Sequence, residues 1–201
     1  MPNWTTNNLQ VKKKDYKKFL EAAVKKVGDE DIDFGVLIEA PVCVIADRYY
    51  NHFVTNTPES PDFNIKEDMD KYKEIDDNFF FDERGERIRL YQVFKSKNDL
   101  QGWYDWQCNK WGTKWGACET CLPDADDIAK ADDEDYLDIT FDTAWSAPMP
   151  WYEELAKVVP FCAECIEEGG FFHLNLDSDG QGNLTVDDDT EEYFANLDED
   201  E

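Results

Sequence analysis

Apolar positions in the first 45 residues follow two different spacings. Residues 4–11 mix apolar and polar side chains as a strand does. Residues 12–27 repeat apolar side chains at intervals of three and four, which predicts an amphipathic helix that stops at Gly28. The other face of this helix is rich in lysine. Residues 33–44 suit a further strand that bends at Pro41.

The pattern is less regular between residues 46 and 95. Pro and Asn predict a loop over 56–62, and the polar run after it predicts a short helix over 66–77. A turn over 82–86 then leads into an alternating strand over 87–95. We therefore expect residues 46–95 to be an insertion.

Regular spacing returns after residue 100, and the elements predicted there run to about residue 186. In chain order they are an aromatic helix over 100–106, a charged connector over 124–135, a strand over 138–145, a helix over 151–159 opened by Pro148 and Pro150, a strand over 161–166 that Gly169 and Gly170 interrupt and that continues over 171–176, a turn over 177–183 and a strand over 184–186.

The order of these elements predicts the fold class. It reads β-α-β, an irregular middle, β-α-β and a hairpin, and split β-α-β units on one antiparallel sheet give an α+β ferredoxin-like sandwich. We expect one such domain over residues 1–186, with the insertion at about 46–95 and an acidic tail over 187–201.

Charge narrows the classes of partner. The chain holds 47 Asp and Glu against 20 Lys and Arg, a formal net charge of -27, which repels nucleic acid and anionic membranes and favours a basic protein surface. No run of 18 apolar residues occurs, and the N-terminus lacks a basic and an apolar segment, so we expect neither a membrane span nor a signal peptide. The expected location is the cytoplasm, with the six Cys reduced.

Several aromatic motifs are similar to those of a known family. They are M-P-N-W over residues 1–4, W-Y-D-W over 103–106, W-G-T-K-W over 111–115 and F-D-T-A-W-S-A-P-M-P over 141–150. Together they resemble the YubB-like family of phage and plasmid proteins with a ferredoxin-like domain. The resemblance covers residues 1–45 and about 100–175, and it implies the fold, an origin on a mobile genetic element and a location in the cytoplasm of a bacterial host cell. It implies no catalytic residue.

The clustered tryptophans have two interpretations. Trp103, Trp106, Trp111, Trp115 and Trp145 could form a platform on which bases or sugars stack. Burial in the core is favoured, because a base-binding platform needs basic neighbours and the neighbouring residues here are acidic.

The spacing of four cysteines matches a structural zinc site. Cys118, Cys121, Cys162 and Cys165 form two C-x-x-C pairs. However, the second pair falls in a predicted strand, where residues three apart face opposite sides. Buried free thiols are therefore favoured, no cofactor is predicted, and structural zinc is the alternative.

Signals for other chemistry are weak. Residues 175–183 are similar to a calcium loop but lack its bidentate Glu, so a hairpin turn is favoured over weak cation binding. His52 and His173 lie in no catalytic motif, and no P-loop, G-x-S-x-G or H-E-x-x-H occurs. We expect no enzymatic activity.

Acidic residues concentrate in the connector and in the tail. The candidate partner-binding residues are Asp124, Asp126, Asp127, Asp132, Asp133, Glu134, Asp135, Asp187, Asp188, Asp189, Glu191 and Glu192. Averaged over the whole surface, the net charge is only about one per 350 Å², against about one per 100 Å² on duplex DNA. A nucleic-acid mimic would therefore need its acids on one face, opposite the basic helix.

The leading hypothesis is an inhibitor that mimics nucleic acid. It would be a non-enzymatic, anti-defence protein of the anti-CRISPR kind that occludes a host defence nuclease or nucleic-acid-binding complex and contacts no nucleic acid itself. The alternative is an accessory or structural phage protein whose acidity serves solubility, with or without zinc.

Overall fold

The computed structural model describes residues 3–25, 31–39, 73–76, 79–81, 87–89 and 103–198. The chain divides into two compact units, residues 1–39 with 107–201, and residues 40–106. Within the described ranges, no helix is both long enough and apolar enough to cross a membrane.

The described strands of the second unit form a three-stranded antiparallel sheet, β2 (Lys73–Asp76), β3 (Phe79–Phe81) and β4 (Arg87–Arg89). The polar helix predicted over 66–77 is wrong at residues 73–76, because pairing with β3 overrides local propensity. The strand predicted over 87–95 is confirmed at residues 87–89. The loop over 56–62 and the turn over 82–86 lie outside the described residues.

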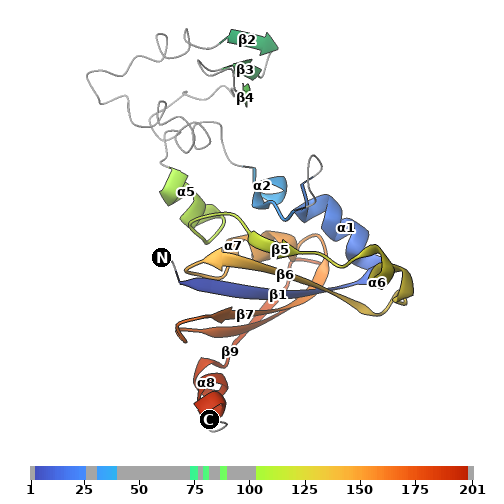
Figure 1. Ribbon diagram of the computed structural model, residues 1–201, viewed down its shortest axis with the longest axis vertical. Helices are drawn as coiled ribbons and strands as arrows, with labels where there is room; N and C mark the ends of the chain where they lie inside the picture. The colour runs from blue at the N-terminus through green and yellow to red at the C-terminus, as the bar shows by residue number, and fades with distance from the viewer. Residues whose placement is uncertain are drawn as a thin grey trace, which may run out of the picture. The chain divides into compact units, whose positions relative to one another are not determined.

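A six-stranded antiparallel sheet is the centre of the first unit (Figure 1). Its order is β5-β6-β1-β7-β8-β9. The strands are β1 (Trp4–Lys12), β5 (Cys118–Cys121), β6 (Tyr136–Ala144), β7 (Pro160–Glu167), β8 (His173–Asp179) and β9 (Leu184–Asp188). The chain is therefore mixed α+β, with strands from both ends of the sequence in one sheet.

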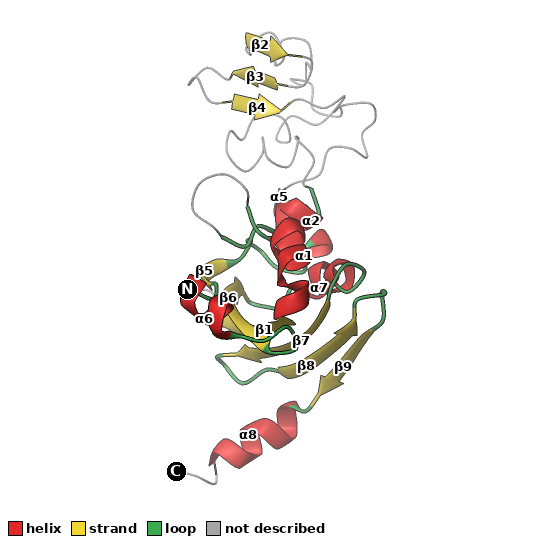
Figure 2. Cartoon of the chain, turned by 90° about the vertical axis from the view of Figure 1, so that its right-hand side faces the viewer, coloured by secondary structure: helices red, strands yellow, loops and turns green. Residues whose placement is uncertain are grey.

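Among the described helices, those that cover the sheet closely lie on one face. Figure 2 shows α1 (Lys13–Ala23), α2 (Phe34–Leu37) and α7 (Met149–Leu155) on one side and α8 (Thr190–Asp198) on the other. The strand β1 alternates accordingly: Leu9 and Val11 are fully buried under the helices, whereas Thr6 and Gln10 are exposed. We call these two sides the covered face and the open face.

Phe34 lies at the centre of the covered core. Its ring centroid is 4.8 Å from that of Trp151, 5.9 Å from that of Trp111 and 6.0 Å from that of Phe141. The strand predicted over 33–44 is wrong here, because Phe34 lies in α2. The Asp33 side chain accepts a hydrogen bond from the Gly35 amide at 2.8 Å and caps this short helix. Residues 40–44 lie outside the described ranges.

The helix α7 connects β6 to β7, and β1 lies between these two strands in the sheet. Both β6 and β7 pair antiparallel with β1, so they run parallel to each other. Phe141 pairs with Asn7 on one side of β1, and Cys165 pairs with Asn7 on the other. The helix α7 begins at Met149, after the Pro148 that was predicted to open it.

Other boundaries differ in instructive ways. The first helix begins at Lys13 and ends at Ala23 rather than at residue 27, because Val24 forms a β-bridge with Ile32. The aromatic helix predicted over 100–106 is α5 (Trp103–Lys110). The strand expected to continue after Gly170 is instead β8, which returns antiparallel along β7. Gly170 has a φ of +77°, which suits a reversing turn.

Two stretches expected to be irregular contain helices and a strand. The connector holds α6 (Ala125–Lys130), which Asp124 caps by accepting from the amide of Asp127. The tail predicted from residue 187 begins with the last two residues of β9 and continues as α8.

Candidate functional site

The open face is polar and largely uncovered. By strand register it carries the even positions of β1, β6 and β7 and the odd positions of β8 and β9. A hollow of about 600 Å³ lies in its middle. Its polar lining includes Asn8, Gln10, Asp138, Glu164, Asn175 and Asp177.

Carboxylates are dense on this face. They are Asp138 and Asp142 of β6, Glu164 of β7, Asp177 and Asp179 of β8 and Asp187 of β9. Neighbouring strands lie about 4.8 Å apart and same-face residues about 6.8 Å apart, so the face of these strands and β1 covers roughly 600 Å². Six carboxylates on that area give about one per 100 Å², and counting the cations Lys12 and His173 of the same face leaves about one net negative charge per 150 Å², against about one per 100 Å² on duplex DNA.

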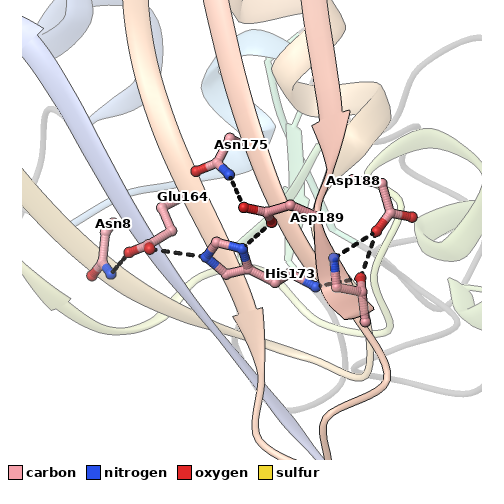
Figure 3. A network of polar contacts seen from close by, with 7 residues as sticks. Asn8, Glu164, His173, Asn175, Asp188 and Asp189 are labelled. Carbon is pink, nitrogen blue, oxygen red and sulfur yellow. Dashed lines mark hydrogen bonds and ion pairs between the residues drawn. The ribbon is translucent and has the colours of Figure 1, made fainter. Parts of the chain in front are cut away.

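A histidine links three elements at one end of this face (Figure 3). The Nε2 atom of His173 lies 2.9 Å from an oxygen of Glu164, and its Nδ1 atom contacts a carboxylate oxygen of Asp189. Asn8 donates to the other oxygen of Glu164 at 2.9 Å, and Asn175 donates to Asp189 at 3.2 Å. We call His173, Glu164 and Asp189 the histidine clasp.

The clasp also holds the start of α8. The hydroxyl of Thr190 accepts a hydrogen bond from the His173 amide at 2.9 Å. The Tyr193 ring stacks on the imidazole with centroids 3.8 Å apart and an interplanar angle of 10°. As a result His173 is only 3% exposed, although it points to the side away from the covering helices.

Two carboxylates favour the charged imidazolium. Burial acts to lower the pKa of His173, but the hydrogen bonds and negative charges of Glu164 and Asp189 outweigh it, so the pKa of His173 is raised above 6.5. Burial acts to raise the pKa of Glu164, and the hydrogen bonds from His173 and Asn8 outweigh it in turn, so that pKa is lowered. Donation from both ring nitrogens requires the protonated ring.

The thiol on this face is a poor nucleophile. Cys162 Sγ lies 3.3 Å from a carboxylate oxygen of Asp177. Burial and this carboxylate raise the pKa of Cys162, which keeps the thiol protonated near neutral pH. The arrangement therefore offers charge and hydrogen-bond acceptors to a partner rather than an activated nucleophile.

The acidic connector lies against the basic helix rather than opposite it. Because Lys12 pairs with Tyr136, the residues before β6 meet the junction of β1 and α1. Glu134 pairs with Lys12 at 2.9 Å and with Lys14 at 2.5 Å. Hydrogen bonds from Lys12 and Lys14 lower the pKa of Glu134 to about 2. The expected segregation of the connector from the first helix is therefore wrong at Glu134.

The remaining predicted acids fall into two groups. Asp126 and Asp127 lie in the first turn of α6, and the backbone carbonyls of Asp133 and Asp135 accept from the amides of Lys14 and Lys13. In the second group, Asp188 accepts from Thr190, and Glu191 and Glu192 form the first turn of α8. The strands β6 and β9, which adjoin these groups, are four spacings apart, roughly 19 Å. The open face lies between them.

The four cysteines of the zinc alternative do not converge. Cys118 and Cys121 are on β5, whereas Cys162 and Cys165 are on β7, with β6 and β1 between them. Cys165 is buried on the covered face and Cys162 lies on the open face, as strand geometry predicted. Among the residues that the structure describes, no three His, Cys, Asp or Glu side chains are placed to hold a metal ion.

The tryptophans separate into buried and exposed members. Trp106 and Trp111 are buried, as expected for core residues. Trp145 is 44% exposed and Trp115 is half-buried, so the core interpretation is wrong for Trp145. The side chain of Trp103 lies outside the described set.

The calcium-like segment is a hairpin turn, as predicted. The Asp179 carboxylate accepts from the Gln181 amide at 2.8 Å and from the Asn183 side chain at 2.6 Å, between β8 and β9. Sequence reasoning missed Asn8, Glu164 and His173. For Asn8 and Glu164 the signal was present as the period-two polar side of strands 4–12 and 160–167.

Comparison of the chain with protein-family models, with curated proteins and with solved structures found no match.

Proposed function

We propose that this chain is a non-enzymatic binding protein whose open face occupies the nucleic-acid-binding surface of a basic partner protein. The observation that supports it is the density of carboxylates, about one per 100 Å², on a sheet face without covering helices over most of its area. The cations on this face within the described strands, Lys12 and His173, are each bound to carboxylates. The face therefore presents net negative charge.

The proposed mechanism is competitive occlusion. Carboxylates on a rigid sheet pair with the Lys and Arg side chains that otherwise hold phosphates. A duplex would be repelled by the same face, so the partner is a protein rather than a nucleic acid. On a mobile genetic element, as the resemblance to the YubB-like family implies, the natural partner is a defence nuclease or its complex.

The sheet order supports a ferredoxin-like assignment for this unit. The order β5-β6-β1-β7 and the split connection through α7 match the arrangement of that fold, with β8 and β9 added at one edge. We propose this topology as the scaffold that leaves the opposite face open.

A displacement assay tests the function with a control for net charge. Labelled duplex DNA is bound to each of a panel of purified bacterial defence nucleases, and the chain is titrated in at low and at high salt. We expect displacement from at least one nuclease, with affinity falling steeply as salt rises.

Two double variants distinguish the contribution of the open face from that of the overall net charge. Asp138→Asn with Asp177→Asn removes two charges from the open face, and Asp126→Asn with Asp132→Asn removes two from the connector. We expect the first to weaken displacement about tenfold or more and the second by less than about threefold. Displacement from no nuclease, equal effects of the two variants, or affinity independent of salt would each refute the proposal.

A further inference from the structure

A lysine ammonium is shared by two indole rings near the end of β6. Lys114 Nζ lies 4.7 Å from the ring centroid of Trp115 and 4.6 Å from that of Trp145. Both distances are within the range of a cation–π interaction. We call Trp115 and Trp145 the indole clamp. In this structure its occupant is a cation on an alkyl stem.

The clamp is held by hydrogen bonds between the loops that carry it. The Ser146 hydroxyl donates to the Gly112 carbonyl at 2.6 Å, which ties the loop of Trp145 to the loop of Trp115. The Trp145 amide donates to the Asn3 carbonyl at 2.9 Å. Gly112, at φ +87°, permits this approach, because a Cβ there would lie 2.5 Å from Pro150 Cδ. The two loops that carry the rings are therefore tied to each other.

Trp145 itself has an unusual backbone and exposure. Its φ is +73°, which is costly for a bulky residue, and its side chain is 44% exposed. A fold that needed only a turn there could use Gly at lower cost. Trp115 also packs near Trp4 of β1, with ring centroids 6.0 Å apart, so the clamp adjoins the open face.

We propose that the indole clamp binds an arginine side chain of the partner protein, which displaces Lys114. Arginine suits the site better than lysine, because its planar, weakly hydrated guanidinium stacks on aromatic faces. Lys114 holds the same place in the free protein and returns to solvent when the guanidinium enters. This inference rests on the proposed function, since it assigns a specific anchor to the basic partner.

A peptide pair tests the clamp without a known partner. The probes are acetyl-Gly-Arg-Gly-amide and its citrulline analogue, which has the same shape and no charge. Binding is followed through the indole N–H signals in two-dimensional NMR, with the signals of Trp115 and Trp145 assigned from single Trp→Phe variants. We expect the arginine peptide to shift the signals of Trp115 and Trp145 and the citrulline peptide to shift neither.

Three variants make the test specific. Lys114→Met removes the competing cation and should tighten arginine binding about two- to fivefold, the equivalent of one exposed cation–π interaction. Lys110→Met makes the same charge change on α5 and should leave the affinity unchanged. Trp145→Leu should abolish the shift at Trp115, with the remaining spectrum showing that the protein is folded.

Equal binding of the two peptides would overturn the inference. So would an affinity of Lys114→Met for the arginine peptide no higher than that of wild type and Lys110→Met. The Asp138→Asn and Asp177→Asn variant should retain peptide binding, because the clamp lies outside the hollow. Failure of the open-face proposal is thereby distinguishable from failure of the clamp.

Discussion

The two faces of the six-stranded sheet are built from the same strands but differ in what they contact. On the covered face, Ile139 and Leu9 are fully buried beneath aromatic side chains such as Tyr152. On the open face, the side chains of their neighbours Thr140 and Asn8 line the hollow. Moving one residue along a strand changes the position from core packing to surface charge, so the strand register separates the apolar core from the charged surface in this molecule.

The covered face nevertheless contains a buried polar group. Asn7 donates to the Thr143 hydroxyl at 3.0 Å, and its carbonyl oxygen accepts from Tyr152 Oη and from Cys165 Sγ, each at 3.3 Å. Burial raises the pKa of Cys165 to about 12 and that of Tyr152 well above 10, so both remain neutral donors. Polar groups there are buried and hydrogen-bonded within the core, whereas those on the open face line the hollow.

Adjacent positions on β6 should show the largest contrast between the faces. Ile139→Ala leaves a cavity in the core and should cost about 2–5 kcal/mol of the free energy of unfolding. Thr140→Ala, on the open face, should cost less than about 1 kcal/mol. Urea unfolding followed by Trp fluorescence measures both. Comparable losses would show that the open face is packed against something in solution.

Two adjacent asparagines give a second contrast. Asn7→Ala strands the Tyr152 hydroxyl and the Cys165 thiol in the core and should cost about 1–3 kcal/mol. Asn8→Ala removes one hydrogen bond to the more exposed Glu164 and should cost about 0.5 kcal/mol. The same urea titration compares them, and a larger loss in Asn8→Ala would invert the assignment of the faces.

The histidine clasp sharpens the comparison through pH. Since the pKa of His173 is raised on folding, its stabilisation is complete below its ordinary value of 6.5 and is lost as pH rises through the raised value. Glu164, whose pKa is lowered, contributes above 4.5 and loses its contribution as pH falls. The clasp should therefore be strongest between about pH 5 and 6.5.

His173→Gln should remove that pH dependence and cost about 1 kcal/mol at pH 6, where wild type has the charged ring. The difference in unfolding free energy between wild type and variant, measured from pH 5 to 9, should shrink as pH rises. Amide exchange over residues 190–196 should accelerate in the variant, because Tyr193 loses the ring on which it stacks and Asp189 loses its contact with the imidazole. A difference independent of pH would contradict a charged clasp.

Charge removal on the open face should have the smallest effect on stability. Asp138→Asn with Asp177→Asn should change the free energy of unfolding by no more than about 0.5 kcal/mol, while it weakens partner binding. Thermal unfolding at two salt concentrations measures this. A loss comparable to that of Asn7→Ala would mean that these carboxylates maintain the fold instead.

The local pattern of apolar and polar residues predicted those helices and strands whose buried side chains repeat at a regular spacing. The strand over 138–145 and the helix after Pro148 were recoverable because their apolar positions repeat with the period of the structure they form. The α2 helix could not be predicted in this way, because four residues are too few to show a period. Its start depends on one hydrogen bond, in which the Asp33 side chain caps the helix. The reversal at Gly170 was misread because the apolar runs on its two sides are alike.

The candidate site was less predictable than the fold. Counting acids along the sequence favoured the connector and the tail, whereas charge density depends on which strands lie side by side. The register of Lys12 with Tyr136 places Glu134 next to lysines. These residues are more than a hundred positions apart, so a rule based on local sequence cannot predict that they pair. His173 likewise acquires its carboxylates from β7 and from the start of α8.

The position of β1 in the middle of the sheet has a consequence for how the protein is made. This strand is translated before its partners, and both of them, β6 and β7, follow about 124 to 162 residues later in the register. At about 5–20 residues per second, the ribosome needs roughly 6 to 32 s to supply them. During that time Leu9 and Val11 have no sheet to enter, so nascent chains should depend on chaperones that hold an unpaired apolar strand.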